Sequence, residues 1–307
     1  MNKINGGRWR AWLAACACAA AAAAGFPAPA DAYTAAGDRL FQATLLLPQI
    51  APGDEFYVNL FNLPLSGGAP GAPGHVNQVN LTWQKTITER FSFSLEESWT
   101  RLDQVGGGSA YGWQNLDTAL KYLAVSDPDR EFLLSVGVDR EIGGTGALRV
   151  GASNSGATTP QLFFGKGFGD FDAGYLRPLA LLGYTGYQIA DTRPRPNLVN
   201  AGFALQYSIP YLQSKVANID MPEFMRSLTP MTEVQFSIPG GTSYGARTTA
   251  LVAPGVSYAG EGWEIAVEGL IPLSRATGRG FGVTAQFHLS LDFIAPTTIG
   301  KPLFSGL

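Results

Sequence analysis

The stretch V-T-A-Q-F-H-L-S-L-D-F, residues 283–293, alternates apolar and polar side chains without interruption. Successive side chains of a strand point to opposite faces, so the alternation predicts a strand with one apolar and one polar face. The stretch is longer than most strands of soluble proteins and matches the roughly 9–11 residues that a tilted strand needs to cross a bilayer. It therefore predicts a membrane-spanning strand near the C-terminus.

The composition supports this interpretation. The chain has 307 residues, enough for one large β domain or two smaller ones, and only 15% of them are charged. Soluble domains average nearer ~25% charged residues. Half-apolar strands diluted by polar lumen residues and glycine-rich loops give such a mixture in a transmembrane β-barrel, and the chain contains 38 Gly and 20 Pro. Beyond residue 32 no apolar run is long enough to predict a spanning helix.

The N-terminus has the organisation of a secretory signal peptide. Three basic residues precede an alanine-rich apolar run at residues 11–24, and the small-residue site A-D-A follows at residues 30–32. We predict a signal peptide at residues 1–32, cleaved after Ala32. Cleavage after Ala30 is the alternative.

Both cysteines, Cys16 and Cys18, fall inside this predicted signal. The L-A-A-C sequence at residues 13–16 also fits a lipoprotein lipobox, which is a second interpretation. Without these cysteines a mature chain forms no disulfide and offers no thiolate nucleophile or Cys metal site. Loss of three basic residues and one acidic residue changes the formal charge from −3 to −5, and an acidic chain without a basic run does not predict nucleic-acid binding.

After the predicted signal peptide, the sequence predicts a short leading segment followed by twelve strands. Residues 33–53 contain Pro48 and Pro52, so we interpret them as a periplasmic segment or a lumenal plug. The predicted strands are residues 55–63, 76–87, 90–102, 113–125, 130–142, 160–168, 171–189, 197–211, 230–238, 246–258, 263–273 and 283–293.

Connection lengths give an independent indication. Links after the second, fourth, sixth and tenth strands are short, and most of the others are longer and rich in Gly, Pro or Ser. This alternation is typical of periplasmic turns and extracellular loops. We therefore predict an all-β fold, a transmembrane antiparallel β-barrel of about twelve strands at residues 54–293, with a periplasmic tail at residues 294–307. A secreted β-sandwich is the rival, but its strands are shorter.

Two local signals lie outside the strand pattern. D-M-P-E at residues 220–223 resembles a capping box with Pro in the first turn, and it predicts a short periplasmic helix within residues 212–229. Phe293 ends the last predicted strand on an aromatic residue, which indicates a signal for the barrel-assembly machinery. The tail beyond it departs from barrels that end on that aromatic.

Three blocks of the C-terminal third carry a family resemblance. They are L-T-P-M-T-E-V at residues 228–234, A-P-G-V-S-Y at 253–258 leading into E-G-L-I-P-L at 268–273, and F-H-L-S-L-D at 287–292 followed by I-G-K-P-L-F at 299–304. They resemble bacterial outer-membrane barrels assigned as transporters and are similar to the outer-membrane proteins of the phenol-degradation meta pathway. The resemblance implies an outer-membrane channel and carries over no substrate or functional residue.

The polar faces of the predicted strands collect charge. We expect these residues to face the lumen: Glu96, Asp117, Lys121, Asp139, Glu141, Arg177, Glu233, Glu264, Glu268, His288 and Asp292. One interpretation is an acidic pore wall that favours cations or neutral polar solutes. The other is a salt-bridged network that closes a narrow lumen, since twelve strands enclose a space between filled small barrels and open porins.

Catalytic and cofactor signals are weak. The sequence has only two histidines, His75 and His288, so we predict no metal site and no cofactor. An outer-membrane lipid hydrolase needs a Ser–His pair near the outer leaflet, whereas the parity of His288 directs it into the lumen. We therefore do not expect an enzyme, and keep lipid hydrolysis as a minor alternative.

These patterns predict a channel of the Gram-negative cell envelope, located in the outer membrane. We expect passive passage of a small-molecule solute, hydrophobic or aromatic by family analogy, although fold analogy does not establish a substrate. The expected partners are outer-membrane lipids, the assembly machinery and the solute. The alternative is a non-conducting structural or surface-interaction barrel with a plugged lumen.

Overall fold

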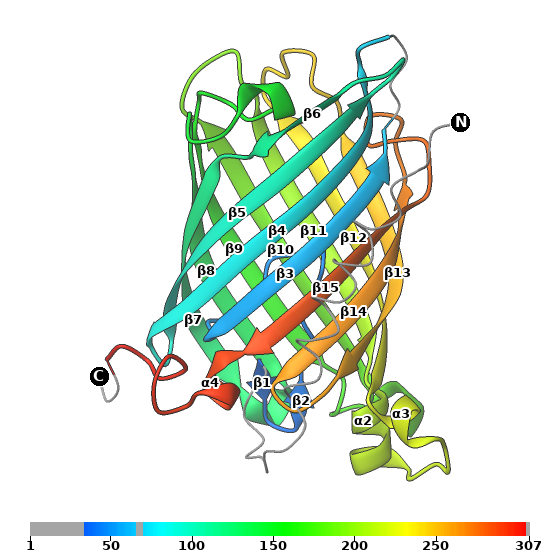
Figure 1. The fold of residues 1–307 in the computed structure, drawn as a ribbon. Coiled ribbons are helices and arrows are strands. Elements are labelled where there is room, and N and C mark those ends of the chain that lie inside the picture. The colour runs from blue at the N-terminus through cyan, green and yellow to red at the C-terminus, as the bar shows by residue number, and fades with distance from the viewer. Residues whose placement is uncertain (1–33, 66–69, 305–307) are drawn as a thin grey trace. The chain divides into compact units, whose positions relative to one another are not determined.

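The alternating stretch forms β15 (Gly282–Ser290), the strand that closes the sheet. It pairs with β14 (Trp263–Pro272) on one side and with β3 (Glu55–Pro64) on the other. The last strand of the wall thus pairs with the first, and the sheet closes into a barrel of tilted strands (Figure 1). Closure pairs the first and last wall strands and so removes the long open edges of a flat sheet.

A computed structural model describes residues 34–65 and 70–304. The predicted signal peptide lies outside the described residues. The other wall strands are β4 (Pro73–Thr88), β5 (Phe91–Gln104), β6 (Ser109–Trp113), β7 (Leu116–Asp127), β8 (Phe132–Ile142), β9 (Ala157–Gly167), β10 (Leu179–Ala190), β11 (Asn197–Tyr207), β12 (Leu228–Gly240) and β13 (Thr249–Ala259). Because β6 and β7 both pair with β5, the wall is a closed twelve-strand antiparallel barrel, which confirms the predicted fold class.

Strand alternation sorts the side chains between membrane and lumen. On β15, Val283 is 42% exposed, whereas its neighbours Gly282 and Thr284 are buried. The outward set across the wall is apolar and well exposed, and it includes Leu60, Leu120, Val136, Leu162, Phe203, Val256 and Val267. A band of exposed apolar residues on a closed barrel is the lipid-facing surface of a membrane barrel.

The predicted end of the closing strand is wrong. The pairing stops at Ser290 because its partner Glu55 is the first residue of β3. The N–H of Leu291 instead donates to the Asp54 carbonyl at 2.7 Å. With no ladder partner left, the chain turns into α4 (Leu291–Ile294) although the apolar–polar alternation continues.

Other boundaries also differ from the prediction, and the strand predicted at residues 197–211 ends at Tyr207. Residues 171–178 are not strand: they form a turn with the 3₁₀ helix η3 (Gly174–Leu176), so this connection is longer than predicted. The fourth predicted strand is broken between β6 and β7. The break occurs at Gln114 and Asn115, whose side-chain amides bind carbonyls of a neighbouring loop at Val150 and Ser153.

The short helical pieces gather mainly at one end. β1 (Ala35–Ala36), β2 (Arg39–Leu40), α2 (Ile209–Tyr211), α3 (Glu223–Arg226) and α4 lie at the end opposite β6 (Figure 1). The remaining turns are η1 (Pro128–Arg130), η2 (Leu148–Val150) and the π-helical η4 (Leu212–Val216). The predicted short helix exists as α3, but its cap residue Pro222 makes no side-chain cap bond, so the capping box is wrong. Within the described residues, no helix is long and apolar enough to cross a membrane.

The C-terminal tail packs against the end of β4. The N–H groups of Leu303 and Phe304 donate to the carbonyls of Thr86 and Ile87 at 3.2 and 2.8 Å. The ammonium of Lys85 binds the Ile299 carbonyl at 3.0 Å. The same ammonium also binds the Lys301 carbonyl and forms a buried ion pair with Asp54. One lysine thus joins the wall, the residue before β3 and the tail.

Candidate functional site

Residues 41–53, here called the inner segment, run inside the barrel without forming a strand or a helix. Their backbone groups therefore lack ladder partners, and buried backbone groups without partners are costly. Side chains on the inner face of the wall bind many of these backbone groups. They come from strands as far apart as β4 and β12. The wall thus holds the inner segment in one conformation.

Two carboxylates bind its N–H groups. Glu233 of β12, fully buried, accepts the N–H groups of Leu45, Leu46 and Leu47 at 2.6, 3.0 and 3.1 Å. Glu264 of β14 accepts the N–H of Ala43 at 3.2 Å. Such charge-assisted bonds are stronger than neutral ones, and each buried carboxylate needs them to offset its lost hydration.

Amide side chains bind the carbonyls. Gln206 donates to the Gln42 carbonyl at 2.9 Å and accepts the Gln42 N–H at 3.1 Å. Gln286, on the closing strand, donates to the Thr44 carbonyl at 3.0 Å. Further donors are Gln235 to Leu46, Lys121 to Gln49 and Gln84 to Ala51. The polar side chains of the lumen face therefore bind many backbone groups of the inner segment.

Apolar side chains of the inner segment pack against glycines of the wall. Phe41, Leu47 and Ile50 are buried in one apolar cluster with wall residues. A Cβ added to Gly165 would lie 2.4 Å from Cδ1 of Ile50, and one added to Gly202 would lie 2.3 Å from Cδ2 of Leu47. Both distances are far below van der Waals contact, so these positions admit only glycine beside the present side chains.

Arg39 anchors the chain just before the inner segment. Its buried guanidinium donates to Glu131 and to the Pro178 carbonyl, both at 3.0 Å, and lies 3.9 Å from the centre of the Tyr211 ring. Tyr211 also donates to Glu131 at 2.9 Å. Burial, together with the bond to Glu131, raises the pKa of the Tyr211 phenol. The phenol therefore stays protonated and available as a donor.

A cavity of about 460 Å³ lies beside the inner segment within the lumen. Residues 44–49 line one side of it, and inward-facing wall residues line the rest. Five of the residues expected to face the lumen are among them: Glu96, Asp117, Lys121, Asp139 and Glu141. Four of these five are acidic. Small-molecule sites commonly have volumes of 300–1,000 Å³, so the cavity has room for one small solute.

The acidic lining is concentrated on three neighbouring strands. The register pairs Glu96 of β5 with Asp117 of β7, and Asp117 with Glu141 of β8. Like charges directly opposite one another destabilise a sheet. Neighbouring amides offset part of this repulsion: Asn80 donates to Glu96 at 2.5 Å, and Asn115 donates to Glu141 at 2.6 Å.

Four other residues expected at the lumen are fully buried and away from the cavity lining: Glu233, Glu264, Glu268 and His288. His288 is 2% exposed, and its ring stacks on Tyr57 with centroids 4.5 Å apart. Its two ring nitrogens lie 3.9 Å from carboxylate oxygens of Glu55 and Glu264. His288 is therefore buried on the inner face of β15, beside the Glu264 carboxylate that binds the inner segment. In the described part of the chain no cluster of His, Cys, Asp and Glu has the arrangement of a metal site.

Arg177 and Asp292 are not on strands, contrary to the prediction. Arg177 follows η3, and its guanidinium binds the Gly169 carbonyl at 2.8 Å within the same turn. Asp292 lies in α4 beyond the end of the closing strand. Both positions follow from the strand boundaries that the alternation misplaced.

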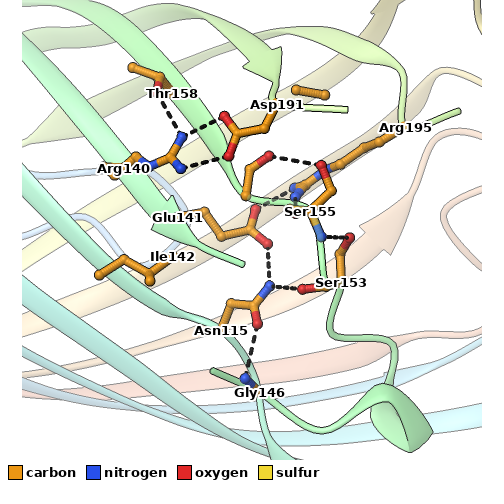
Figure 2. A network of polar contacts seen from close by, with 12 residues as sticks. Asn115, Arg140, Glu141, Ile142, Gly146, Ser153, Ser155, Thr158, Asp191 and Arg195 are labelled. Atoms are coloured by element: carbon orange, nitrogen blue, oxygen red, sulfur yellow. Dashed lines mark hydrogen bonds and ion pairs between the residues drawn. The ribbon is translucent and has the colours of Figure 1, made fainter. Parts of the chain in front are cut away.

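A polar network lies at the end of the barrel that carries the β10–β11 loop (Figure 2). The strand pattern did not predict it. Arg195, in the β10–β11 loop, binds Glu141 inside the lumen. Asp191 of the same loop forms a two-point ion pair with Arg140, with both contacts at 2.6 Å (Figure 2). The bonds from Arg140 lower the pKa of Asp191, which therefore stays ionised. Because Glu141 and Arg140 face opposite sides of β8, this loop is tied to both sides of the wall.

Comparison with known proteins identifies the fold. No protein-family model matches the chain, and no curated protein matches its sequence. The COG4313 outer membrane channel from Pseudomonas putida F1 superposes with a TM-score of 0.52 at 13% identity, over 82% of this chain and 99% of that chain. The chain has the fold of an outer-membrane β-barrel. The KdgM porin (TM-score 0.46, 12% identity, 77% and 98% covered) and the NanC porin (0.47, 9%, 76% and 98%) are more distant matches.

Proposed function

We propose that the protein is a passive outer-membrane channel for a small neutral or cationic solute. The observation that carries the proposal is the cavity of about 460 Å³ in the lumen, whose charged lining has four carboxylates and one lysine. A barrel maintained only for structure has no need to place Glu96, Asp117 and Glu141 abreast on three strands, because that arrangement costs stability. The shared fold with an outer-membrane channel agrees with this role.

The substrate class is a finer part of the proposal. Phe61, Phe163 and Tyr184 line the same cavity as the carboxylates. Aromatic rings beside polar groups suit a small aromatic solute with a polar or positively charged substituent. This agrees with the expectation drawn from the resemblance to phenol-degradation outer-membrane proteins.

Ion selectivity in planar bilayers tests the proposal. The purified barrel should give stable conductance steps, and its reversal potential in a KCl gradient should indicate preference for potassium over chloride. The double variant Glu96→Gln/Asp117→Asn should lower that preference, because it removes two of four lining carboxylates. Glu97→Gln is the matched control, since Glu97 has the opposite parity on β5. A folded barrel that is anion-selective, or that stays silent even when the inner segment is released, would contradict the proposal.

The second candidate is a non-conducting barrel whose loops act at the cell surface. It is favoured by the inner segment, which fills part of the lumen and is bound by several wall side chains. Conductance distinguishes the channel from the non-conducting barrel. A channel must give conductance steps either with the inner segment bound in the lumen or after its release. A barrel that stays silent after the inner segment is released would support this second candidate.

A further inference from the structure

We infer that a pocket on the outer rim of the barrel binds the phosphorylated headgroup of an outer-leaflet glycolipid, the lipopolysaccharide of the membrane that holds the barrel. The pocket has a volume of about 430 Å³ and lies between the β10–β11 and β12–β13 loops. Its lining includes Tyr187, Ile189, Arg193 and Tyr244. It is separate from the lumen cavity, with which it shares no lining residue.

The pocket faces the membrane side of the wall. Gln188 lines the lumen cavity, so its neighbours Tyr187 and Ile189 on β10 point outward. They are 41% and 45% exposed. The Tyr187 hydroxyl accepts the side-chain N–H of Asn197 at 3.2 Å, which fixes the ring at the rim. A tyrosine and an isoleucine at this level continue the apolar band upward into the headgroup layer.

The pocket also offers an unpaired positive charge. Of its three charged residues, Asp191 is paired with Arg140 and Arg195 is paired with Glu141. Arg193 is exposed and makes no hydrogen bond or ion pair within the described residues. A guanidinium binds a phosphate through two parallel hydrogen bonds, whereas a zwitterionic or neutral headgroup gives it a weaker partner.

The charge of the loops at this end supports an anionic surface as the partner. The links joining strands at this end, residues 65–72, 105–108, 143–156, 191–196, 241–248 and 273–281, contain six arginines and one acid. The links at the other end, residues 89–90, 128–131, 168–178, 208–227 and 260–262, contain eight acids and five bases. The outer leaflet carries the phosphates of lipopolysaccharide, so this asymmetry places positive charge against negative charge.

Binding of lipopolysaccharide to the purified, folded barrel in detergent tests the inference. The probe is fluorescently labelled lipopolysaccharide with both lipid A phosphates, compared with the same material after dephosphorylation. Arg193→Ala should weaken binding of the phosphorylated probe by about tenfold, the usual effect of losing one charge-assisted contact. Arg193→Lys keeps the positive charge but loses the two-point geometry, so it should retain only part of the affinity. Arg226→Ala, an arginine variant at the opposite end, is the matched control and should bind as the wild type does.

Each outcome decides the inference. Equal binding of the dephosphorylated probe, or unchanged binding by Arg193→Ala, would overturn it. Displacement of the probe by millimolar inorganic phosphate would show a free-phosphate site and would overturn the lipid assignment. Tyr187→Ala tests the apolar half of the pocket: weaker binding of both probes supports a lipid headgroup, and no change contradicts it. Heat-modifiable migration on gels confirms that every variant is folded.

Discussion

The carboxylate of Glu233 accepts the backbone N–H of Leu45 at 2.6 Å, across 188 positions of sequence. The same carboxylate accepts the next two N–H groups of the inner segment. One wall side chain therefore binds three consecutive residues of a segment that has no secondary structure of its own. We expect this contact to contribute to holding the inner segment in the lumen.

Glu233→Gln should release the inner segment more often. The amide keeps one acceptor oxygen, but in place of the other it presents N–H donors to an N–H group of the inner segment, because Leu45 binds one carboxylate oxygen and Leu46 and Leu47 bind the other. Loss of charge-assisted bonds of this kind costs about 1.5–3 kcal/mol, enough to raise the released population more than tenfold. Single-channel recordings should show more frequent steps of higher conductance than the wild type.

Glu97→Gln makes the same chemical change on the outward parity of β5 and should leave the recordings unchanged. Unchanged conductance in Glu233→Gln, with residues 41–53 still resistant to added protease, would refute this role of Glu233.

Gly165→Ala should destabilise the barrel through its contact with Ile50. The added Cβ would lie 2.4 Å from Cδ1 of Ile50, so either the inner segment or the wall must shift. Overpacking of this kind typically costs 1–3 kcal/mol. The double variant Gly165→Ala/Ile50→Ala should lose less than the sum of the single changes, because removing Ile50 opens the space that the methyl group needs.

Urea unfolding in detergent, followed by tryptophan fluorescence, measures this coupling. Gly174→Ala is the control, since its Cβ would meet its nearest heavy atom at 3.4 Å, an ordinary contact. Additive losses in the double variant would show that the close approach of Gly165 and Ile50 does not matter.

The sequence predicted the barrel because a two-residue period and the turn chemistry are local properties of each strand. They placed all twelve strand positions, and the structure pairs the last of these strands with the first. The same locality explains the errors. Alternation continues through Leu291 and Phe293, yet the strand ends at Ser290 because β3 begins at Glu55. Where a strand ends depends on its partner, which the pattern does not contain.

The site was predicted only in part, for a related reason. The parity of β5, β7 and β8 correctly grouped Glu96, Asp117 and Glu141 on one face, and the register brought them abreast. Pro48 and Pro52 indicated that residues 33–53 are not a wall strand but left a periplasmic and a lumenal location open. Glu233 and Gly165 were the wall residues whose presence in the sequence could have indicated a segment inside the lumen. Their partners lie more than a hundred residues away, so only the fold reveals them.

Lys85→Ala should loosen the C-terminal tail. The ammonium forms a buried ion pair with Asp54 and binds the carbonyls of Ile299 and Lys301. Removing one partner of a buried pair leaves the other charge uncompensated, at a typical cost of 3–5 kcal/mol. The unfolding midpoint should fall, and limited proteolysis should cut the tail faster than in the wild type.

Lys85→Ala/Asp54→Ala separates the two contributions of this lysine. It should recover part of the lost stability, because no unpaired carboxylate remains, but it should leave the tail sensitive to protease. A tail that remains protected in both variants would show that the N–H bonds of Leu303 and Phe304 suffice to hold it.

Asp292→Asn should stabilise the folded protein at neutral pH. Burial is the main cause that raises the pKa of Asp292 from 3.8 to about 6. A carboxyl with a raised folded-state pKa favours folding in its protonated form, so its contribution is present below pH 4 and is lost as pH rises through 6. Asn has no such loss, so the stability of the variant relative to wild type should grow between pH 4 and pH 7. Its upper limit is roughly 3 kcal/mol, which screening by solvent reduces.

Asp170→Asn provides a control of opposite sign for this titration. A hydrogen bond from Lys166 lowers the pKa of Asp170, so the ionised carboxylate favours folding above pH 4 and that contribution is lost on acidification. The Asp170 variant should therefore lie below the wild type by a nearly constant amount between pH 4 and pH 7, while the Asp292 variant rises above the wild type over the same range. Urea unfolding curves of all three proteins at pH 4, 5, 6 and 7 measure both trends. Parallel curves for Asp292→Asn and wild type across this range would show that the α4 carboxyl is solvated and titrates alike in both states.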